Sequence, residues 1–167
     1  MRAVLILILI MSSGCGWQLR GLEPIPASLN TLRLEIQNPN DEFGRALRRT
    51  LGSAGITILA TAEESSTTTL LRVSNVRHER RAISTTDLGK AAEYELVSLL
   101  EYEVEDSAGN LIAGPEGLLS EKIYVFDQNN VASASQEEQL LRDEMRRELI
   151  QQLLRRYRAV TLPTTAQ

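Results

Sequence analysis

The chain has 167 residues, of which 43% are hydrophobic and 24% charged, so it can bury the core of one domain and is too apolar for global disorder. Its net charge of -4 argues against a general nucleic-acid-binding protein, because neutralising phosphates requires a basic surface. A single cysteine excludes an intramolecular disulfide and a CxxC motif. A single histidine argues against a histidine-ligated metal site, and we expect neither a metal nor a cofactor.

The N-terminus has the features of an export signal. Arg2 precedes the apolar run AVLILILIM (3–11), which as a helix is too short to cross a hydrocarbon core of about 30 Å. The small residues SSG (12–14) then lead directly to Cys15. This pattern predicts a signal peptide over residues 1–14. The alternative is an ordinary secretory signal followed by a buried free thiol.

The small residues before Cys15 resemble the lipobox of bacterial lipoproteins, although Ser12 stands where an aliphatic residue is usual. The resemblance implies that Cys15 is acylated, becomes the first residue of the mature chain and anchors it to a membrane. Several acyl chains anchor a protein firmly, whereas one chain binds only marginally. Gly16, in place of the aspartate that marks inner-membrane retention, implies the periplasmic face of the outer membrane.

The first part of the mature chain predicts an arm, a strand and a helix. Residues 15–30 contain a P-x-P step without periodicity and are expected to form an extended arm. TLRLEI (31–36) alternates as a strand does, and FGRALRRTL (43–51) has helical spacing behind acidic cap residues. GITIL (55–59) is a short β-like piece.

The middle of the chain predicts further strands. A polar, threonine-rich loop leads to a strand over 70–77, and the charged residues around His78 predict a solvated strand end. AAEYELVSLLEYEVED (91–106) is the clearest strand, with apolar side chains on one face and five glutamates on the other. Five acids in a row without a nearby histidine indicate a solvated sheet surface, not a catalytic or metal site. These glutamates are Glu93, Glu95, Glu101, Glu103 and Glu105.

The end of the chain predicts a turn, a strand and a long helix. DSAGN (106–110) is a hairpin turn, and GPEG (114–117) is expected to break the chain before a strand over 118–127. After a loop over 128–134, Ser135 and Glu138 have the spacing of a capping box. The helix that follows has an apolar stripe, and its late arginines suit the helix dipole. Two pairs have i,i+4 spacing: Glu138 with Arg142, and Asp143 with Arg147.

These elements predict an α+β fold. A single sheet of about four strands, with both helices packed on one face, buries every apolar stripe in the order β-α-β-β-β-α. We expect one domain over residues 31–160 and a flexible tail over 161–167. The sequence contains no phosphate-binding glycine loop, nucleophile elbow or zinc-protease motif, so we expect no catalytic residues and no enzyme.

Four segments resemble the LptE family of lipopolysaccharide-assembly lipoproteins. CGWQLRG (15–21) is similar to the start of the mature family proteins. FGRALRRTLGSAGI (43–56), GKAAEYEL (89–96) and residues 126–156 resemble the family's first helix, long strand and last helix. The segments occur in the family's order and together extend over nearly the whole chain.

The resemblance implies a sheet with two helices and an outer-membrane lipoprotein. Members of the family plug the large β-barrel protein LptD, assist its assembly and bind lipopolysaccharide on its way to the cell surface. The expected partners are therefore an LptD-like barrel, lipopolysaccharide and the membrane, with no nucleic acid. The alternative is another outer-membrane lipoprotein that acts as a protein-only scaffold or pilotin.

Lipopolysaccharide binding calls for cations that face phosphates. In some relatives, basic residues before the long strand and at the start of the last helix have this role, but the corresponding positions here are Asp87 and Ser135. The resemblance therefore cannot be transferred residue by residue, and ordinary surface charge is the alternative for the cations nearby. The candidates are Arg77, Arg80, Arg81, Lys90 and Lys122.

Overall fold

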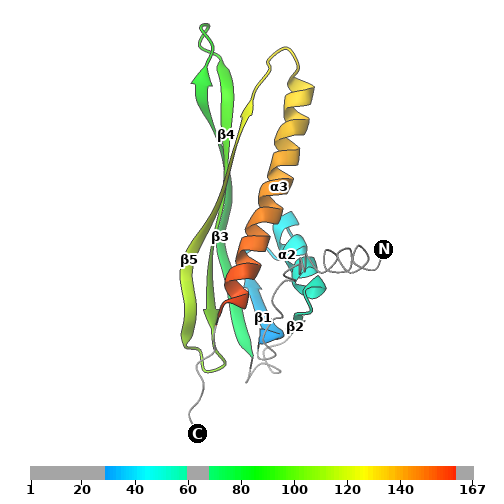
Figure 1. Ribbon diagram of the computed structural model, residues 1–167, viewed down its shortest axis with the longest axis vertical. Helices are drawn as coiled ribbons and strands as arrows, with labels where there is room; N and C mark the ends of the chain where they lie inside the picture. Colours follow the sequence, from blue (N-terminus) through cyan, green and yellow to red (C-terminus); the bar gives the residue numbers. More distant parts are fainter. Residues whose placement is uncertain (1–28, 60–67, 161–167) are drawn as a thin grey trace, which may run out of the picture.

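One mixed sheet carries two helices on one face in the computed structural model, which describes residues 29–59 and 68–160 (Figure 1). The predicted signal peptide, Cys15 with most of the arm, the segment 60–67 and the predicted tail lie outside the described residues. The elements in chain order are β1 (Thr31–Ile36), α2 (Glu42–Ser53), β2 (Thr57–Leu59), β3 (Thr69–Thr85), β4 (Ala91–Glu105), β5 (Leu111–Val125) and α3 (Val131–Arg158).

The sheet has the strand order β2-β1-β3-β4-β5. β1 lies parallel to both β2 and β3, whereas β3, β4 and β5 form an antiparallel meander. The predicted α+β class, the single sheet and the two helices on one face are confirmed. The sheet has five strands instead of about four, because the short piece after α2 pairs with β1, with Thr31 opposite Thr57.

Helix α2 begins where the sequence places a cap. The Asp41 side chain accepts a hydrogen bond from the Gly44 amide at 2.6 Å, which satisfies one of the free N–H groups of the first turn. Gly44 leaves room for the preceding loop, since a Cβ there would lie 2.7 Å from the carbonyl oxygen of Asn38. Phe43 and Leu47 then face the core.

Strand β3 is longer than predicted and continues to Thr85. A bulge between Ser74 and Arg77, with Asn75 at a φ of 51°, interrupts the alternation without ending the pairing to β4. The prediction that the strand ends near His78 was wrong. His78 lies in the middle of β3, and its Nδ1 atom is 2.7 Å from the Ser98 hydroxyl on β4.

Strand β5 begins at Leu111, before the predicted break at residues 114–117. Gly114 and Pro115 form a bulge opposite Glu103, and a Cβ at Gly114 would collide with the carbonyl oxygen of Tyr102. The prediction of a break was wrong because β5 is an edge strand, where a proline can be tolerated without a lost ladder hydrogen bond.

Helix α3 begins at Val131, earlier than predicted, and its cap is Asn130, whose side chain accepts a hydrogen bond from the Ser133 amide at 3.3 Å. The predicted loop to residue 134 and the predicted capping box were therefore wrong. The Glu138–Arg142 ion pair forms as its spacing indicates, at 2.7 Å. Asp143 pairs with Arg146 at 2.8 Å, not with Arg147.

Two long elements lie side by side. β4 has 15 residues, or about 50 Å of strand, and α3 has 28 residues, or about 42 Å of helix. Figure 1 shows α3 running along the β3–β4–β5 meander, while β1, β2 and α2 lie beside its lower half. We call the upper end, formed by the β3–β4 turn (86–90) and the β5–α3 connection (126–130), the distal end.

The apolar core is concentrated away from the distal end. The main cluster joins α2, the sheet and the C-terminal half of α3, and it includes Leu47, Leu51, Leu100, Leu149 and Leu153. The distal half has only a small buried cluster, formed by Leu96, Tyr124 and Met145. The predicted apolar stripe of the last helix is confirmed, but it is fully buried only in its C-terminal half. No helix in the described part of the chain is both long and apolar enough to span a membrane.

Candidate functional site

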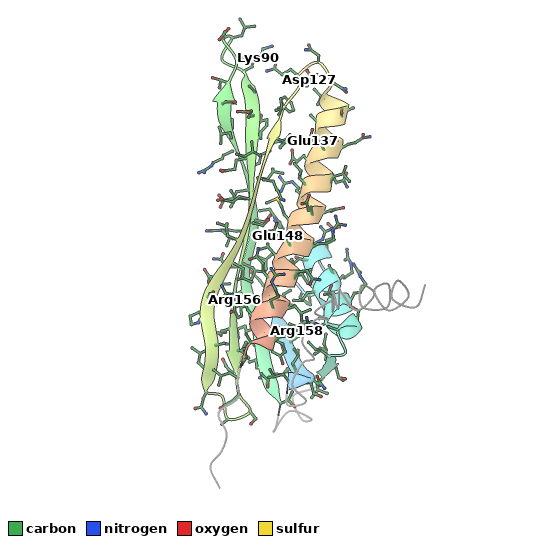
Figure 2. All side chains as sticks on the ribbon, viewed as in Figure 1. Lys90, Asp127, Glu137, Glu148, Arg156 and Arg158 are labelled. Carbon is green, nitrogen blue, oxygen red and sulfur yellow. The ribbon has the colours of Figure 1, made fainter. Side chains whose placement is uncertain are left out.

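The five predicted cations do not form one cluster. Strand alternation places Arg77 and Arg81 on the sheet face that carries no helix, and it places Arg80 on the face toward α3. Lys122 also lies on the helix side, and Lys90 lies in the β3–β4 turn at the distal end (Figure 2). Four of the five form ion pairs, so their charges are already partly neutralised.

Glu138 is the centre of a polar cluster between α3 and the sheet. Its carboxylate accepts hydrogen bonds from the Tyr124 hydroxyl at 2.6 Å and from Arg80 at 2.8 Å. Arg142 donates to the second carboxylate oxygen at 2.7 and 2.9 Å. Arg80 also lies over the ring of Tyr94, 4.6 Å from its centre. We call these five residues the Glu138 cluster.

The electrostatics of the Glu138 cluster favour an ionised carboxylate. Partial burial opposes ionisation of Glu138, but the hydrogen bonds from the tyrosine and the two arginines outweigh it and lower the pKa of Glu138 to about 2. Burial, with the hydrogen bond to Glu138, raises the pKa of Tyr124 to about 12. The cluster therefore stays charged and hydrogen-bonded at neutral pH, and it fastens the distal half of α3 to β3 and β5.

Further polar contacts continue along the seam between β5 and α3. Lys122 donates a hydrogen bond to Glu144 at 2.9 Å, and the Ser120 hydroxyl donates one to Glu148 at 2.8 Å. The pairing with Glu144 raises the pKa of Lys122. Lys122 is therefore part of the contact between strand and helix.

The distal end combines exposed apolar side chains with Lys90. A hollow of about 630 Å³ lies between the β3–β4 turn and the β5–α3 connection, lined by Leu88, Lys90 and Phe126 among others. Leu88 is 83% exposed, and Val131, at the start of α3, is 53% exposed. Within the described residues, no carboxylate lies within ion-pair distance of Lys90. Figure 2 shows Lys90 and Asp127 at this end of the molecule.

Residues 29–59 and 68–160 contain no group of three His, Cys, Asp or Glu side chains that could hold a metal ion. His78 and Ser98 are hydrogen-bonded, but Ser98 is only 1% exposed, which keeps its hydroxyl from a substrate. Partial burial, together with the charges of Arg142 and Arg146, lowers the pKa of His78. The pair is best explained as a contact between β3 and β4.

A comparison of the chain with protein-family models finds a match. A family model described as LptE, lipopolysaccharide-assembly, matches residues 29–157. The chain belongs to the LptE family. The family resemblance inferred from the sequence is thereby confirmed.

Relatives of known name support the same family. The LptE-family chain is 34% identical over 157 residues to the LPS-assembly lipoprotein LptE of Pectobacterium atrosepticum, which covers 92% of this chain and 82% of the relative. It is 31% identical over 153 residues to the LPS-assembly lipoprotein LptE of Yersinia pestis (strain Pestoides F), covering 89% of this chain and 70% of the relative. Both matches extend over most of each protein.

Solved structures share the fold of this LptE-family chain. The rare lipoprotein B of Shewanella oneidensis matches with a TM-score of 0.66 and 26% identity, covering 75% of this chain and 91% of that one. A minor lipoprotein of Acinetobacter baumannii matches with a TM-score of 0.65 and 25% identity, covering 83% of this chain and all of that one. These likenesses agree with the two helices and the open mixed sheet.

Most contacts of the Glu138 cluster in this LptE-family chain could not be recognised from the sequence. Arg80 was predicted as a surface cation for lipid, but it is held between Glu138 and Tyr94. The alternation of side chains along an extended strand could have distinguished Arg80 from Arg77 and Arg81, because it places Arg80 on the opposite face of the sheet. The same alternation puts Tyr124 on the helix side.

Proposed function

We propose that the chain is an outer-membrane lipoprotein that is anchored through acylated Cys15, plugs an LptD-type β-barrel, assists its assembly and binds lipopolysaccharide. The family match over residues 29–157 is the observation that carries this proposal. The relatives named LPS-assembly lipoprotein extend the likeness over about nine-tenths of the chain. The lipobox-like residues before Cys15 support the anchor.

The narrow, elongated form is consistent with a plug. The β3–β4–β5 meander and α3 run along one long axis, so the chain can be inserted lengthwise into a wide barrel (Figure 1). The polar seam between β5 and α3 keeps the narrow distal half together where little apolar core is available.

The plug is tested by coexpressing the full-length chain with the LptD-like barrel from the same genome and purifying a tagged barrel from detergent-extracted membranes. We expect the chain to copurify with the barrel after stringent washing. Its absence from the purified barrel, when both proteins are present in the membrane, would contradict the plug. Copurification without any retained lipopolysaccharide would favour a protein-only scaffold.

For lipopolysaccharide, we propose contact at the distal end through Lys90, with Leu88 and Val131 offering apolar surface to acyl chains. Lys90 carries the proposal because the four other candidate cations already face glutamates. Arg77 pairs with Glu79, Arg80 with Glu138, Arg81 with Glu95 and Lys122 with Glu144. Asp87, in the same turn, weakens the local positive potential, so the expected affinity for phosphate is modest.

Reversing Lys90 tests this contact. We expect Lys90→Glu to lower lipopolysaccharide retention by the purified full-length chain at least roughly threefold, because an exposed attraction of about 1 kcal/mol is replaced by repulsion. Arg49→Glu, an exposed reversal on α2, is the control and is expected to leave retention unchanged. Retention of each variant is measured by passing the purified protein over immobilised lipopolysaccharide and quantifying the bound protein by gel densitometry. Equal retention by wild type and Lys90→Glu would remove Lys90 from the site.

A further inference from the structure

The β3–β4–β5 meander has one face that no helix covers within the described part of the chain. The strand register defines the residues of this face toward the distal end, since only alternate side chains of each strand point to it. They are Ser74, Arg77, Glu79 and Arg81 on β3, Glu93, Glu95, Val97, Leu99 and Glu101 on β4, and Gly117, Leu119, Glu121, Ile123 and Val125 on β5. Both helices pack against the opposite face (Figure 1). We call this surface the open face.

The open face carries a strip of apolar side chains. Leu99 on β4 lies directly opposite Leu119 on β5, and Ile123 and Val125 continue the strip along the edge strand. Leu119, Ile123 and Val125 are 49%, 59% and 65% exposed. Apolar side chains left this exposed on one sheet face are typical of a surface that is covered by a partner.

The charges around the apolar strip are mainly negative. The open face has five glutamates and two arginines, and both arginines already pair with glutamates of the same face, Arg77 with Glu79 and Arg81 with Glu95. The surplus acids include Glu93, opposite Val125, and Glu121, which lies on the same face of β5 between Leu119 and Ile123. Such a surface repels lipid phosphates, and a second copy of the chain would bring the same acidic surplus against it.

A protein surface with basic side chains around an apolar patch satisfies both features. We propose that the open face is the surface by which the chain docks against the inner wall of its barrel, and that the contacted wall is apolar with a basic border. The inference rests on the proposed function, because the barrel is the partner that the function supplies. It also gives two adjoining surfaces different partners, since the open face binds protein and the distal end, with Lys90, faces lipid, and Val125 lies at their border.

The copurification assay tests the docking surface with substitutions of opposite charge. We expect the double substitution Leu119→Lys and Ile123→Lys to lower the amount of chain recovered with the tagged barrel at least tenfold. Leu119→Glu with Ile123→Glu removes the same apolar area but faces a basic wall, so its loss is expected to be several times smaller. Leu140→Lys, on α3 where Leu140 is 69% exposed, is the matched control and is expected to be recovered as wild type.

A single reversal keeps the apolar strip intact. Glu121→Arg is expected to lower recovery about threefold, whereas Glu137→Arg, an exposed reversal on α3, is expected to leave it unchanged. Recovery of the lysine double variant at the wild-type level, or an equal loss for Leu140→Lys, would overturn the docking surface while leaving the plug intact. Failure of the wild-type chain to copurify would instead overturn the proposed function and this inference with it. Circular dichroism confirms that each variant is folded.

Discussion

Replacing Glu138 with glutamine is expected to lower the free energy of unfolding at pH 7 by about 3 kcal/mol. The shift in the pKa of Glu138 from 4.5 to about 2 on folding, at about 1.4 kcal/mol per unit, gives this order of magnitude. The carboxylate accepts hydrogen bonds from Tyr124 and from two arginines, and its side chain is only 16% exposed. Urea unfolding at pH 7, followed by circular dichroism, measures the change.

The same substitution has a defined pH dependence. Because folding lowers the pKa of Glu138, its contribution to stability is fully present above about pH 4.5 and is lost as the pH falls toward 2. Wild type should therefore lose more stability than Glu138→Gln over this range. Glu137→Gln, on the exposed side of the same turn, is expected to behave as wild type. An equal loss in wild type and Glu138→Gln would contradict the assigned role of the cluster.

Shortening Leu149 is expected to have a similarly large effect through a different mechanism. Leu149 is fully buried in the main apolar cluster, so Leu149→Ala should cost about 3 kcal/mol through lost transfer free energy and a residual cavity. Leu140→Ala, on the exposed side of α3, is the control and should change stability by less than about 0.5 kcal/mol. Thermal unfolding with both variants tests this, and equal effects would contradict the placement of the core.

The two substitutions should also differ in where they act. Glu138→Gln removes the main attachment of the distal half of α3, whereas Leu149→Ala weakens the part of the helix that packs on α2 and the sheet. Hydrogen exchange by mass spectrometry should show faster exchange confined to the N-terminal half of α3 in Glu138→Gln. In Leu149→Ala, exchange should rise over the whole domain.

Local periodicity was sufficient for the elements whose stabilising contacts follow the chain. The alternation of β1 and β4, the 106–110 turn and the apolar stripe of α3 were predicted because each pattern is complete within its own segment. The fold class followed from packing these stripes against one another. The location of the turn was confirmed by Asp106, whose side chain accepts hydrogen bonds from the Ala108 and Asn110 amides at 2.8 Å.

The distal half could not be predicted in the same way, because its stabilising contacts connect distant parts of the chain. The extension of β3 has charged residues on both faces, and Arg80 finds its partner Glu138 at a separation of 58 residues. Ser135 and Glu138 match a capping box locally, yet the helix begins at Val131 and Glu138 binds Tyr124. Edge position, which no local pattern reveals, allowed β5 to include Pro115.

The candidate site was predicted as residue types and not as a place. Five cations near the strands were named from the sequence, but they lie in three places. Arg77 and Arg81 lie on one face of the sheet, Arg80 and Lys122 lie on the other, and Lys90 lies in the distal turn. Their glutamate partners come from β3, β4 and α3, so their availability depends on tertiary contacts. Only Lys90 keeps the open environment that the sequence suggested for all five.

The most direct test of the central claim is the mass of the detergent-extracted complex of the full-length chain with its barrel. Size-exclusion chromatography with light scattering, followed by mass spectrometry of the components, measures it. The proposed plug predicts one acylated chain for each barrel, with Cys15 carrying the acyl groups and lipopolysaccharide retained. A barrel that elutes without the chain, or a chain that elutes alone, would contradict it.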